Sequence, residues 1–221
     1  MSYIYRCTAK DFKFGDSKEQ TLAQAILQNT RLIRVSIVIP THNNVETVTF
    51  VLSELRTALV KVDAIPKFYL VDDKSSDGTT ELIRDKLSCE NDVLPVYLAK
   101  RVGQVGAIVV GLKKCEQHNP IIVTSADGQD SAESVARLIV VWKERQVDMV
   151  IAKRNKDSQV NLNNFHRIVS FFYHRYPTSG FDMVLVSRVL VDKLLSGKPI
   201  RFLQIDMLLE ARSVSYIDYA K

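Results

Sequence analysis

Short β-branched apolar runs alternate with amphipathic segments along most of this chain. The run 35–39 ends at Pro40 and has the composition of a buried strand. Between residues 45 and 60, apolar side chains recur at helical spacing, from Val48 to Leu59. The same alternation predicts further strands at 68–71, 93–99, 120–124 and 148–152, and further helices at 79–87, 105–117 and 131–145. Strands that alternate with helices in this way indicate right-handed crossovers and a mostly parallel α/β sheet flanked by helices.

The two ends of the chain differ from this pattern. Residues 17–27 are predicted to form a helix that begins after a cap at Ser17. The predicted units are therefore an N-terminal helical appendage at 1–33 and a main domain at 34–221, whose halves are 34–130 and 131–221. The alternation loosens after Lys153, where 165–176 is the next segment predicted to be helical.

Polar clusters follow four of the predicted strands. They are Thr41-His42-Asn43-Asn44, the stretch 72–78, Lys100-Arg101, and the stretch 125–130. Parallel sheets bind ligands at the carboxyl ends of their strands. Four such loops at one edge of the sheet therefore predict one binding site.

Two of these loops carry carboxylates that could either bind a ligand or stabilise the loop itself. Asp72 and Asp73 can accept hydrogen bonds from the imino N–H of a base or from a ribose hydroxyl, but acids in this loop also suit a turn and a helix cap. In the second loop, Asp127 and Gln129 are oxygen ligands suited to Mg²⁺ or Mn²⁺, which would bridge a diphosphate. The same loop can instead simply cap the helix that begins at Ser131.

Basic and glycine residues surround the start of the predicted helix 105–117. Lys100, Arg101 and Gly103 can bring cations and helix N–H groups towards a phosphate. Gly111 is better explained by close packing of the helix.

The order of these motifs resembles the family 2 glycosyltransferases, which have the GT-A (Rossmann-like) fold. The matching stretches are 35–43, 71–79, Gly103 with Ala107 and Gly111, 126–130 with Glu133, and Ser179-Gly180-Phe181-Asp182 with Arg188. The resemblance covers about residues 34 to 195. In its motifs the chain is closest to the branch of dolichyl-phosphate mannose synthases and undecaprenyl-phosphate sugar transferases.

The resemblance implies a role for each matching residue. Pro40, Thr41, Asn43, Lys100, Arg101 and Gly103 would bind the nucleotide or its phosphates, and Asp72 or Asp73 would hold the base. Asp127 and Gln129 would hold the metal and the diphosphate. Arg154, with His166 or Arg167, would face the diphosphate or an acceptor phosphate. If the acceptor is a hydroxyl, Asp182 or Asp206 would be the base, although a helix cap is favoured for Asp206.

The chain departs from the family pattern in two ways. Ser125 stands where the family has the first aspartate of its Asp-x-Asp motif, and a hydroxyl brings no charge to a cation. Members of the lipid-phosphate branch also usually continue into a basic segment and membrane-associated helices, which this sequence does not contain before its last residue, Lys221.

Composition and charge limit the classes of molecule that this protein could bind. The chain is 46% hydrophobic and 25% charged, as in globular proteins, and no apolar run approaches the roughly 20 residues of a membrane span. The net charge of +5 suits a polyphosphate ligand or an ordinary basic surface, and without an aromatic ladder or a long basic run nucleic acid is disfavoured. Cys7, Cys89 and Cys115 have neither metal-site nor disulfide-framework spacing, which favours a reducing cytoplasm, at the inner membrane face if the acceptor is a lipid.

The sequence thus predicts a metal-dependent, inverting hexosyltransferase that uses a UDP- or GDP-sugar. Its acceptor would be a polyprenyl phosphate or a growing cell-surface glycan, in polysaccharide or glycolipid biosynthesis. Because of Ser125, the alternative is a catalytically silent nucleotide-sugar-binding domain of the same fold. A nucleotidyltransferase is disfavoured, because the Gly-rich loop expected after the first strand of that class is missing from this sequence. A hydrolase triad is disfavoured as well, because the histidines are scattered.

Overall fold

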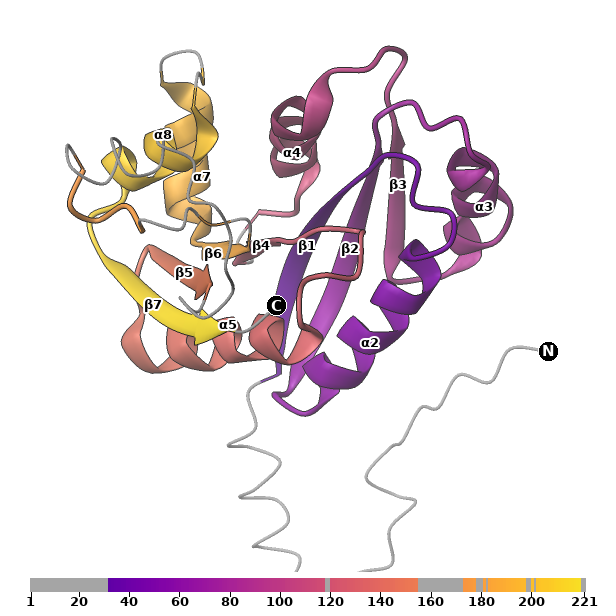
Figure 1. Cartoon of the computed structure of the whole chain (residues 1–221). Helices are drawn as coiled ribbons and strands as arrows, with labels where there is room; N and C mark the ends of the chain where they lie inside the picture. The colour runs from indigo at the N-terminus through magenta and orange to yellow at the C-terminus, as the bar shows by residue number, and fades with distance from the viewer. Residues whose placement is uncertain are drawn as a thin grey trace, which may run out of the picture. The chain divides into compact units, whose positions relative to one another are not determined.

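The computed structural model describes residues 32–117, 120–154, 173–177, 181, 183–197, 200 and 202–219. Seven strands form one sheet in the order β3-β2-β1-β4-β6-β5-β7 (Figure 1). The strands are β1 (Ile33–Thr41), β2 (Ala64–Asp72), β3 (Val93–Tyr97), β4 (Ile121–Val123), β5 (Met149–Arg154), β6 (Val184–Val186) and β7 (Val214–Tyr219). β6 runs antiparallel to β4 and β5, whereas the pairs β1–β2, β1–β4, β2–β3 and β5–β7 are parallel. The predicted, mostly parallel sheet is therefore confirmed.

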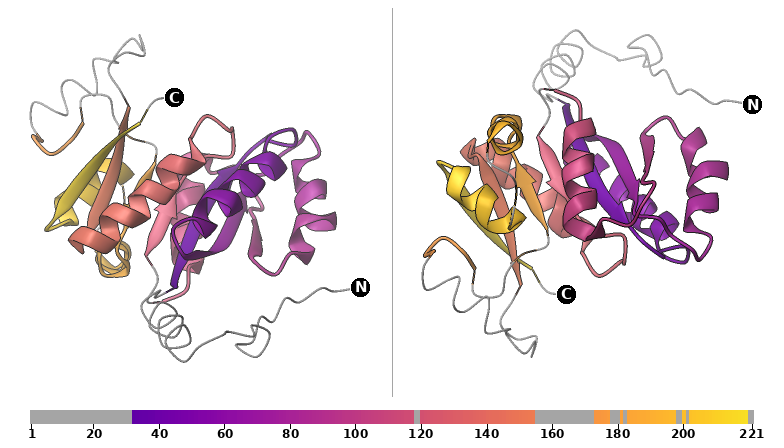
Figure 2. Two further views of the ribbon diagram at one scale, coloured as in Figure 1. Left: turned by 90° about the horizontal axis from the view of Figure 1, so that it is seen from below. Right: turned by 90° about the horizontal axis from the view of Figure 1, so that it is seen from above.

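Helices cover both faces of the sheet (Figure 2). The helices are α2 (Val48–Val60), α3 (Thr79–Asp85), α4 (Gly103–Lys114), α5 (Ala132–Arg145), α7 (Arg188–Ser196) and α8 (Leu203–Glu210), with a 3₁₀ turn, η1 (Leu87–Cys89). α2 and α5 lie on one face, and α4, α7 and α8 lie on the other. Successive side chains of each central strand point to opposite faces of the sheet. Ile37 packs in the core beneath α2 and α5, and Val38 packs in the core beneath α4.

Most differences from the predicted boundaries have local causes. α2 begins at Val48 rather than at 45, because the carbonyl of Asn44 accepts the N–H groups of both Thr47 and Val48 in a preceding turn. β2 extends back to Ala64 past Pro66, which is tolerated because β3 pairs with β2 only from Phe68 onward.

The second half of the chain contains elements that the sequence pattern did not predict. These are β6, α7, α8 and β7. Residues 173–176, the last part of the predicted helix 165–176, form a turn, and residues 165–172 lie outside the described residues. The predicted helix at 17–27 and residues 1–31 of the predicted appendage at 1–33 also lie outside them, whereas Ile33 is the first residue of β1. In the part of the chain that is described, no helix has both the length and the hydropathy needed to cross a membrane.

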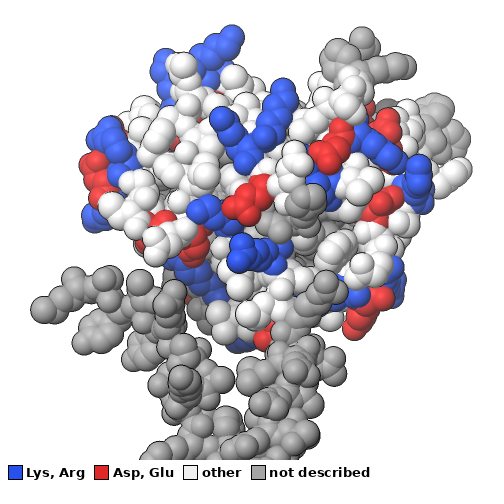
Figure 3. Space-filling view, turned by 180° about the vertical axis from the view of Figure 1, so that it is seen from behind, with Lys and Arg blue, Asp and Glu red and all other residues white. Residues whose placement is uncertain are grey.

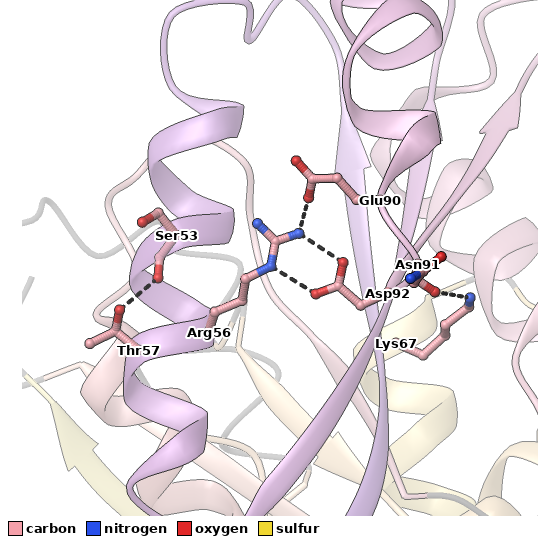
Figure 4. A network of polar contacts seen from close by, with 7 residues as sticks. All are labelled: Ser53, Arg56, Thr57, Lys67, Glu90, Asn91 and Asp92. Atoms are coloured by element: carbon pink, nitrogen blue, oxygen red, sulfur yellow. Dashed lines mark hydrogen bonds and ion pairs between the residues drawn. The ribbon is translucent and has the colours of Figure 1, made fainter. Parts of the chain in front are cut away.

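An ion-pair network ties α2 to the segment that leads into β3 (Figure 4). Arg56 donates to the two carboxylate oxygens of Asp92 at 2.7 and 2.9 Å, and it also pairs with Glu90. The guanidinium lies 5.4 Å from the ring centroid of Phe68, and its hydrogen bonds to Asp92 raise its pKa. These groups are partly exposed, so water screens the attraction, and the network mainly fixes the position of α2.

One face of the molecule carries charges of both signs. On the face seen from behind, Lys and Arg side chains are spread among Asp and Glu (Figure 3). This mixture is what an ordinary basic surface with a net charge of +5 would give.

Gly111 lets α4 lie directly on the sheet. A Cβ at this position would lie 3.1 Å from Val71 Cγ2 and would overlap Val38 Cγ1. Val38 and Val71 are fully buried in the central strands, so neither can move aside. The close-packing role predicted for Gly111 is therefore confirmed.

We expect Gly111→Ala to destabilise the protein. The overlap with Val38 puts the overpacking cost at the upper end of its usual range, about 2–3 kcal/mol. The gain in helix propensity returns about 1 kcal/mol, which leaves a net loss of about 1–2 kcal/mol. Urea unfolding followed by circular dichroism measures this difference. Lys113→Ala, at an exposed position of the same helix, is the control and should change the free energy of unfolding by less than about 0.5 kcal/mol. Equal stability of Gly111→Ala and wild type would contradict the packing argument.

We also expect the two described cysteines to differ in reactivity. Cys89 is exposed, whereas Cys115 is buried, and burial raises the pKa of the Cys115 thiol to about 12. Only the thiolate reacts, so iodoacetamide at pH 8 should label Cys89 and leave Cys115 unmodified until the protein is unfolded. Peptide mass mapping reads each cysteine separately, and rapid native labelling of Cys115 would show that α4 is loosely packed.

Candidate functional site

A cavity of ≈270 Å³ lies at the carboxyl ends of β1 and β2 and beside the loop that follows β4. We call it the strand-end cavity. It is lined by Pro40, Thr41, His42, Asn44, Asp73, Arg101, Gly103, Gln104, Ala107, Ser125, Ala126 and Asp127. Of the residues that the sequence assigned to a site, the cavity brings together Pro40, Thr41, Asp73, Arg101, Gly103 and Asp127.

Asp73 joins three elements beside this cavity. Its two carboxylate oxygens accept the backbone N–H groups of Val102 and Gly103, at 2.7 and 2.8 Å, where α4 begins. Its own N–H donates to the carbonyl of Thr41 at 2.8 Å, and its carbonyl oxygen lies 3.0 Å from Nδ1 of His42. The first N–H groups of α4 therefore point at a carboxylate of the protein, which leaves Arg101 as the exposed cation at this wall.

Asp72 has a different position from its neighbour. Both aspartates are buried, but Oδ1 of Asp72 accepts from the N–H and hydroxyl of Ser75, while Oδ2 accepts the hydroxyl of Thr80 at 2.6 Å. It does not line the strand-end cavity. Asp72 therefore folds the loop that follows β2, and the geometry favours Asp73 as the carboxylate nearest a bound ligand.

Asn43 and Lys100 also lie outside the lining of the cavity. Asn43 has a φ of +55°, and its side-chain oxygen accepts the N–H of Ser76 at 2.9 Å, so it joins the loops after β1 and β2. Lys100 is exposed in the segment between β3 and α4. His42 and Asn44, which the sequence analysis placed in a polar cluster without giving either an individual role, do line the cavity.

Asp127 is the exposed carboxylate of the acidic loop, residues 125–130. Its Oδ1 accepts the hydroxyl of Ser125 at 2.6 Å and the N–H of Gln129 at 2.9 Å. Among the described residues, Oδ2 has no hydrogen-bond partner. The backbone of the loop is anchored by Thr47, whose hydroxyl donates to the carbonyl of Ala126 at 2.7 Å. The predicted metal ligand thus faces the cavity with one carboxylate oxygen available.

Asp130 holds the same loop from behind, and the sequence reasoning did not assign it a role. Its Oδ2 accepts the hydroxyl of Thr124 at 3.1 Å and the N–H of Ser125 at 3.0 Å, and the Ser125 hydroxyl also lies 3.0 Å away. A hydroxyl has one proton, so Ser125 cannot donate fully to both Asp127 and Asp130. Oδ1 of Asp130 is buried and has no partner among the described residues. The loop therefore concentrates negative charge that its own donors do not fully satisfy.

This arrangement fits a divalent cation held by few protein ligands. Within the described residues, no group of three or more His, Cys, Asp or Glu side chains could enclose a metal ion. Mg²⁺ commonly takes one or two carboxylates, with substrate phosphates and water as its other ligands. The available oxygen of Asp127 suits that mode, and the exposed side chain of Gln129 lies two residues farther along the same loop.

The remaining predicted residues are placed only in part. His166, Arg167 and Asp182 lie outside the described residues, and Arg154 is described only as the last residue of β5, without its side chain. Asp206 accepts the N–H of Phe202 at 3.0 Å at the start of α8, which is the capping role favoured by the sequence. Ser131 caps α5 by accepting the N–H of Ser134 at 3.4 Å.

The comparisons with known proteins agree with this architecture. The mannosyltransferase PcManGT from Pyrobaculum calidifontis, solved in complex with GDP-Man and Mn²⁺, superposes with a TM-score of 0.59 at 15% identity, over 91% of this chain and 63% of that one. S. aureus TarS 1-349 in complex with UDP-GlcNAc superposes with a TM-score of 0.56 at 19% identity, over 86% of this chain and 59% of that one. At these identities the likeness establishes the fold.

Sequence similarity identifies the family. An undecaprenyl-phosphate 4-deoxy-4-formamido-L-arabinose transferase of Aeromonas hydrophila subsp. hydrophila is 34% identical over 114 residues, which cover 51% of this chain and 35% of that protein. The chain thus matches about a third of the length of this relative. The family model described as glycosyl transferase family 2 matches residues 36–189, a range that includes the strand-end cavity and the acidic loop. With its GT-A fold and this match, the chain belongs to glycosyltransferase family 2.

Proposed function

We propose that this protein transfers a sugar, with inversion, from a UDP- or GDP-sugar to a polyprenyl phosphate. The observation that carries the proposal is the strand-end cavity, in which Asp73 and Arg101 face the acidic loop with Asp127. This set suits a nucleotide diphosphate, because a carboxylate can accept hydrogen bonds from a base or ribose, and a cation and a metal-binding carboxylate can hold the phosphates. The relative from Aeromonas hydrophila, named as an undecaprenyl-phosphate transferase, supports a lipid-phosphate acceptor.

Different residues of the cavity would bind the nucleoside and the diphosphate of the donor. Asp73 is fixed by backbone N–H groups and would orient the nucleoside, while Arg101 would lie against the phosphates. Asp127, with Gln129, would hold Mg²⁺ or Mn²⁺, and the cation, when bound, neutralises charge on the diphosphate leaving group. A phosphate acceptor is already anionic at neutral pH and needs no general base. Asp182 would take that role only for a glycan hydroxyl acceptor.

Ser125 supports a second candidate, a nucleotide-sugar-binding domain without transfer activity. Its hydroxyl contacts both Asp127 and Asp130 but adds no negative charge to the loop. A loop with weaker cation affinity would still allow the nucleotide to bind while lowering or abolishing transfer.

A thermal-shift panel of UDP-, GDP- and dTDP-sugars, with and without Mn²⁺, tests nucleotide binding first. A ligand that binds only the native state at 100 times its Kd adds about 2.7 kcal/mol to the free energy of unfolding. We expect one nucleotide to raise the Tm, and to raise it further with Mn²⁺. If no sugar nucleotide shifts the Tm, the proposed donor site is wrong.

We expect Asp127→Asn to remove the contribution of Mn²⁺ to donor binding. Hydrolysis or transfer of the sugar by this variant should also be about 100-fold or more slower than by the wild type, a size typical of the loss of one electrostatic stabiliser. Asp85→Asn is the control, because Asp85 is exposed and, within the described residues, forms its ion pair with the neighbouring Arg84. Unchanged turnover in Asp127→Asn would disprove the metal assignment. If the wild type binds a nucleotide sugar without turnover and Ser125→Asp gains turnover, the silent domain is the correct function.

Asp73→Asn tests the other wall of the cavity. The amide oxygen can accept from only one of Val102 and Gly103, so we expect a loss of about 1–2 kcal/mol in the free energy of unfolding, as for a lost helix cap. Nucleotide affinity should fall as well, at least tenfold, because the start of α4 borders the cavity. Urea unfolding and calorimetric titration measure the two effects. A destabilised variant with wild-type nucleotide affinity would confine Asp73 to a structural role.

A further inference from the structure

A second cavity, of ≈190 Å³, lies between α4 and α8, which share one face of the sheet (Figure 2). We call it the apolar cavity. Ile108 of α4, Val123 of β4, Val184 of β6 and Met207 of α8 form part of its wall. None of these residues has been given a role in binding the donor.

The polar groups of this cavity are mostly used within the protein. Oε1 of Gln204 accepts the hydroxyl of Tyr176 at 2.6 Å, and the amide of Gln204 donates to the carbonyl of Phe181. What remains towards the cavity is largely hydrocarbon. A ligand that fills it should be mainly apolar, because a sugar or a phosphate would lose hydrogen bonds to water and find few in return, the amide of Gln104 being one.

Two large apolar side chains stand exposed among the lining residues. Val105, at the start of α4, is 47% exposed, and Phe202, just before α8, is 57% exposed. Ligand pockets are lined predominantly by hydrophobic side chains, and these two border both the cavity and the solvent. They give an apolar ligand a route from the cavity to the surface.

The apolar cavity and the strand-end cavity share Gln104 in their linings. Gln104 is the second residue of α4 and follows Gly103, which borders the strand-end cavity. A ligand that spans this point would have a charged end beside Arg101 and Asp127 and a hydrocarbon end between α4 and α8. Neither a nucleotide nor a hexose has that division into a charged end and a hydrocarbon end.

We propose that the apolar cavity binds the first isoprene units of a prenyl phosphate whose phosphate faces the strand-end cavity. The inference rests on the proposed function and adds the place at which the acceptor is recognised. A dry cavity of about 150 Å³ accommodates a benzene-sized molecule, so this one holds one or two five-carbon units. The rest of the chain leaves over Val105 and Phe202.

The first test varies the length of the prenyl group. Calorimetric titration of the full chain with UDP or GDP present compares inorganic phosphate with dimethylallyl, geranyl and farnesyl phosphates. We expect affinity to rise at least tenfold from inorganic phosphate to geranyl phosphate and then to level off, because the cavity is full. Equal affinity for all four ligands overturns the inference. So does binding of farnesol as tightly as farnesyl phosphate, since the phosphate would then play no part.

Val105→Asp gives the second test, with Val189→Asp as its matched control. Both valines are exposed on helices, but Val189 lies on α7 and does not line the cavity. We expect Val105→Asp to weaken geranyl phosphate binding at least tenfold while its Tm and its affinity for the nucleotide stay those of the wild type. An equal loss in Val189→Asp would show a general surface effect and overturn the inference.

The donor assay separates failure of this inference from failure of the proposed function. A wild-type protein that binds a nucleotide sugar but no prenyl phosphate refutes the apolar cavity as an acceptor site and leaves the donor site standing. A protein that binds neither refutes both.

Discussion

Asp73 accepts the N–H groups of Val102 and Gly103 while its own backbone is bonded to Thr41 and lies beside His42. One residue therefore connects the ends of β1 and β2 to the beginning of α4. The position of α4 along the sheet follows from this connection and from Gly111, which allows the helix to approach Val38. Both cavities depend on it, because α4 contributes a wall to each.

The acidic loop shows a second constraint: it has too few hydrogen-bond donors for its carboxylates. Ser125 has one hydroxyl proton for two carboxylates, and Oδ1 of Asp130 has no partner among the described residues. An aspartate in place of Ser125 would add charge but would remove the donor that now lies between Asp127 and Asp130. The substitution therefore exchanges affinity for a cation against stability of the loop without one. This is why Ser125 bears on both candidate functions.

Much of the first half of the fold could be predicted from sequence, because its signals are local. Each parallel strand from β1 to β4 contains a short apolar run, and the helices α2 and α4 between them repeat their apolar residues at helical spacing. β6 is only Val184–Val186 and is inserted antiparallel between β4 and β5, so its identity depends on partners distant in sequence. A three-residue apolar run contains no periodicity from which to predict this. The motif order nevertheless identified the family before the fold was known.

The predicted site was less complete than the fold for a related reason. A strand-end position predicts which loops meet, and Pro40, Thr41, Arg101 and Asp127 do meet. It does not predict which of two adjacent carboxylates lines the cavity. Asp72 accepts hydrogen bonds from Ser75 and Thr80, whereas Asp73 accepts them from the start of α4 and lines the cavity. Those choices depend on hydrogen bonds between loops, which no spacing in the sequence encodes.

The two cavities together suggest how one site can accept ligands of opposite character. Arg101 and Asp127 border the strand-end cavity, where charged groups can compensate one another, and Ile108 and Met207 border the apolar cavity. Water excluded by a hydrocarbon ligand in the second cavity would strengthen electrostatic interactions in the first. Acceptor binding would then favour the donor's leaving group as well as place the nucleophile. Gln104, common to both linings, stands where that coupling would pass.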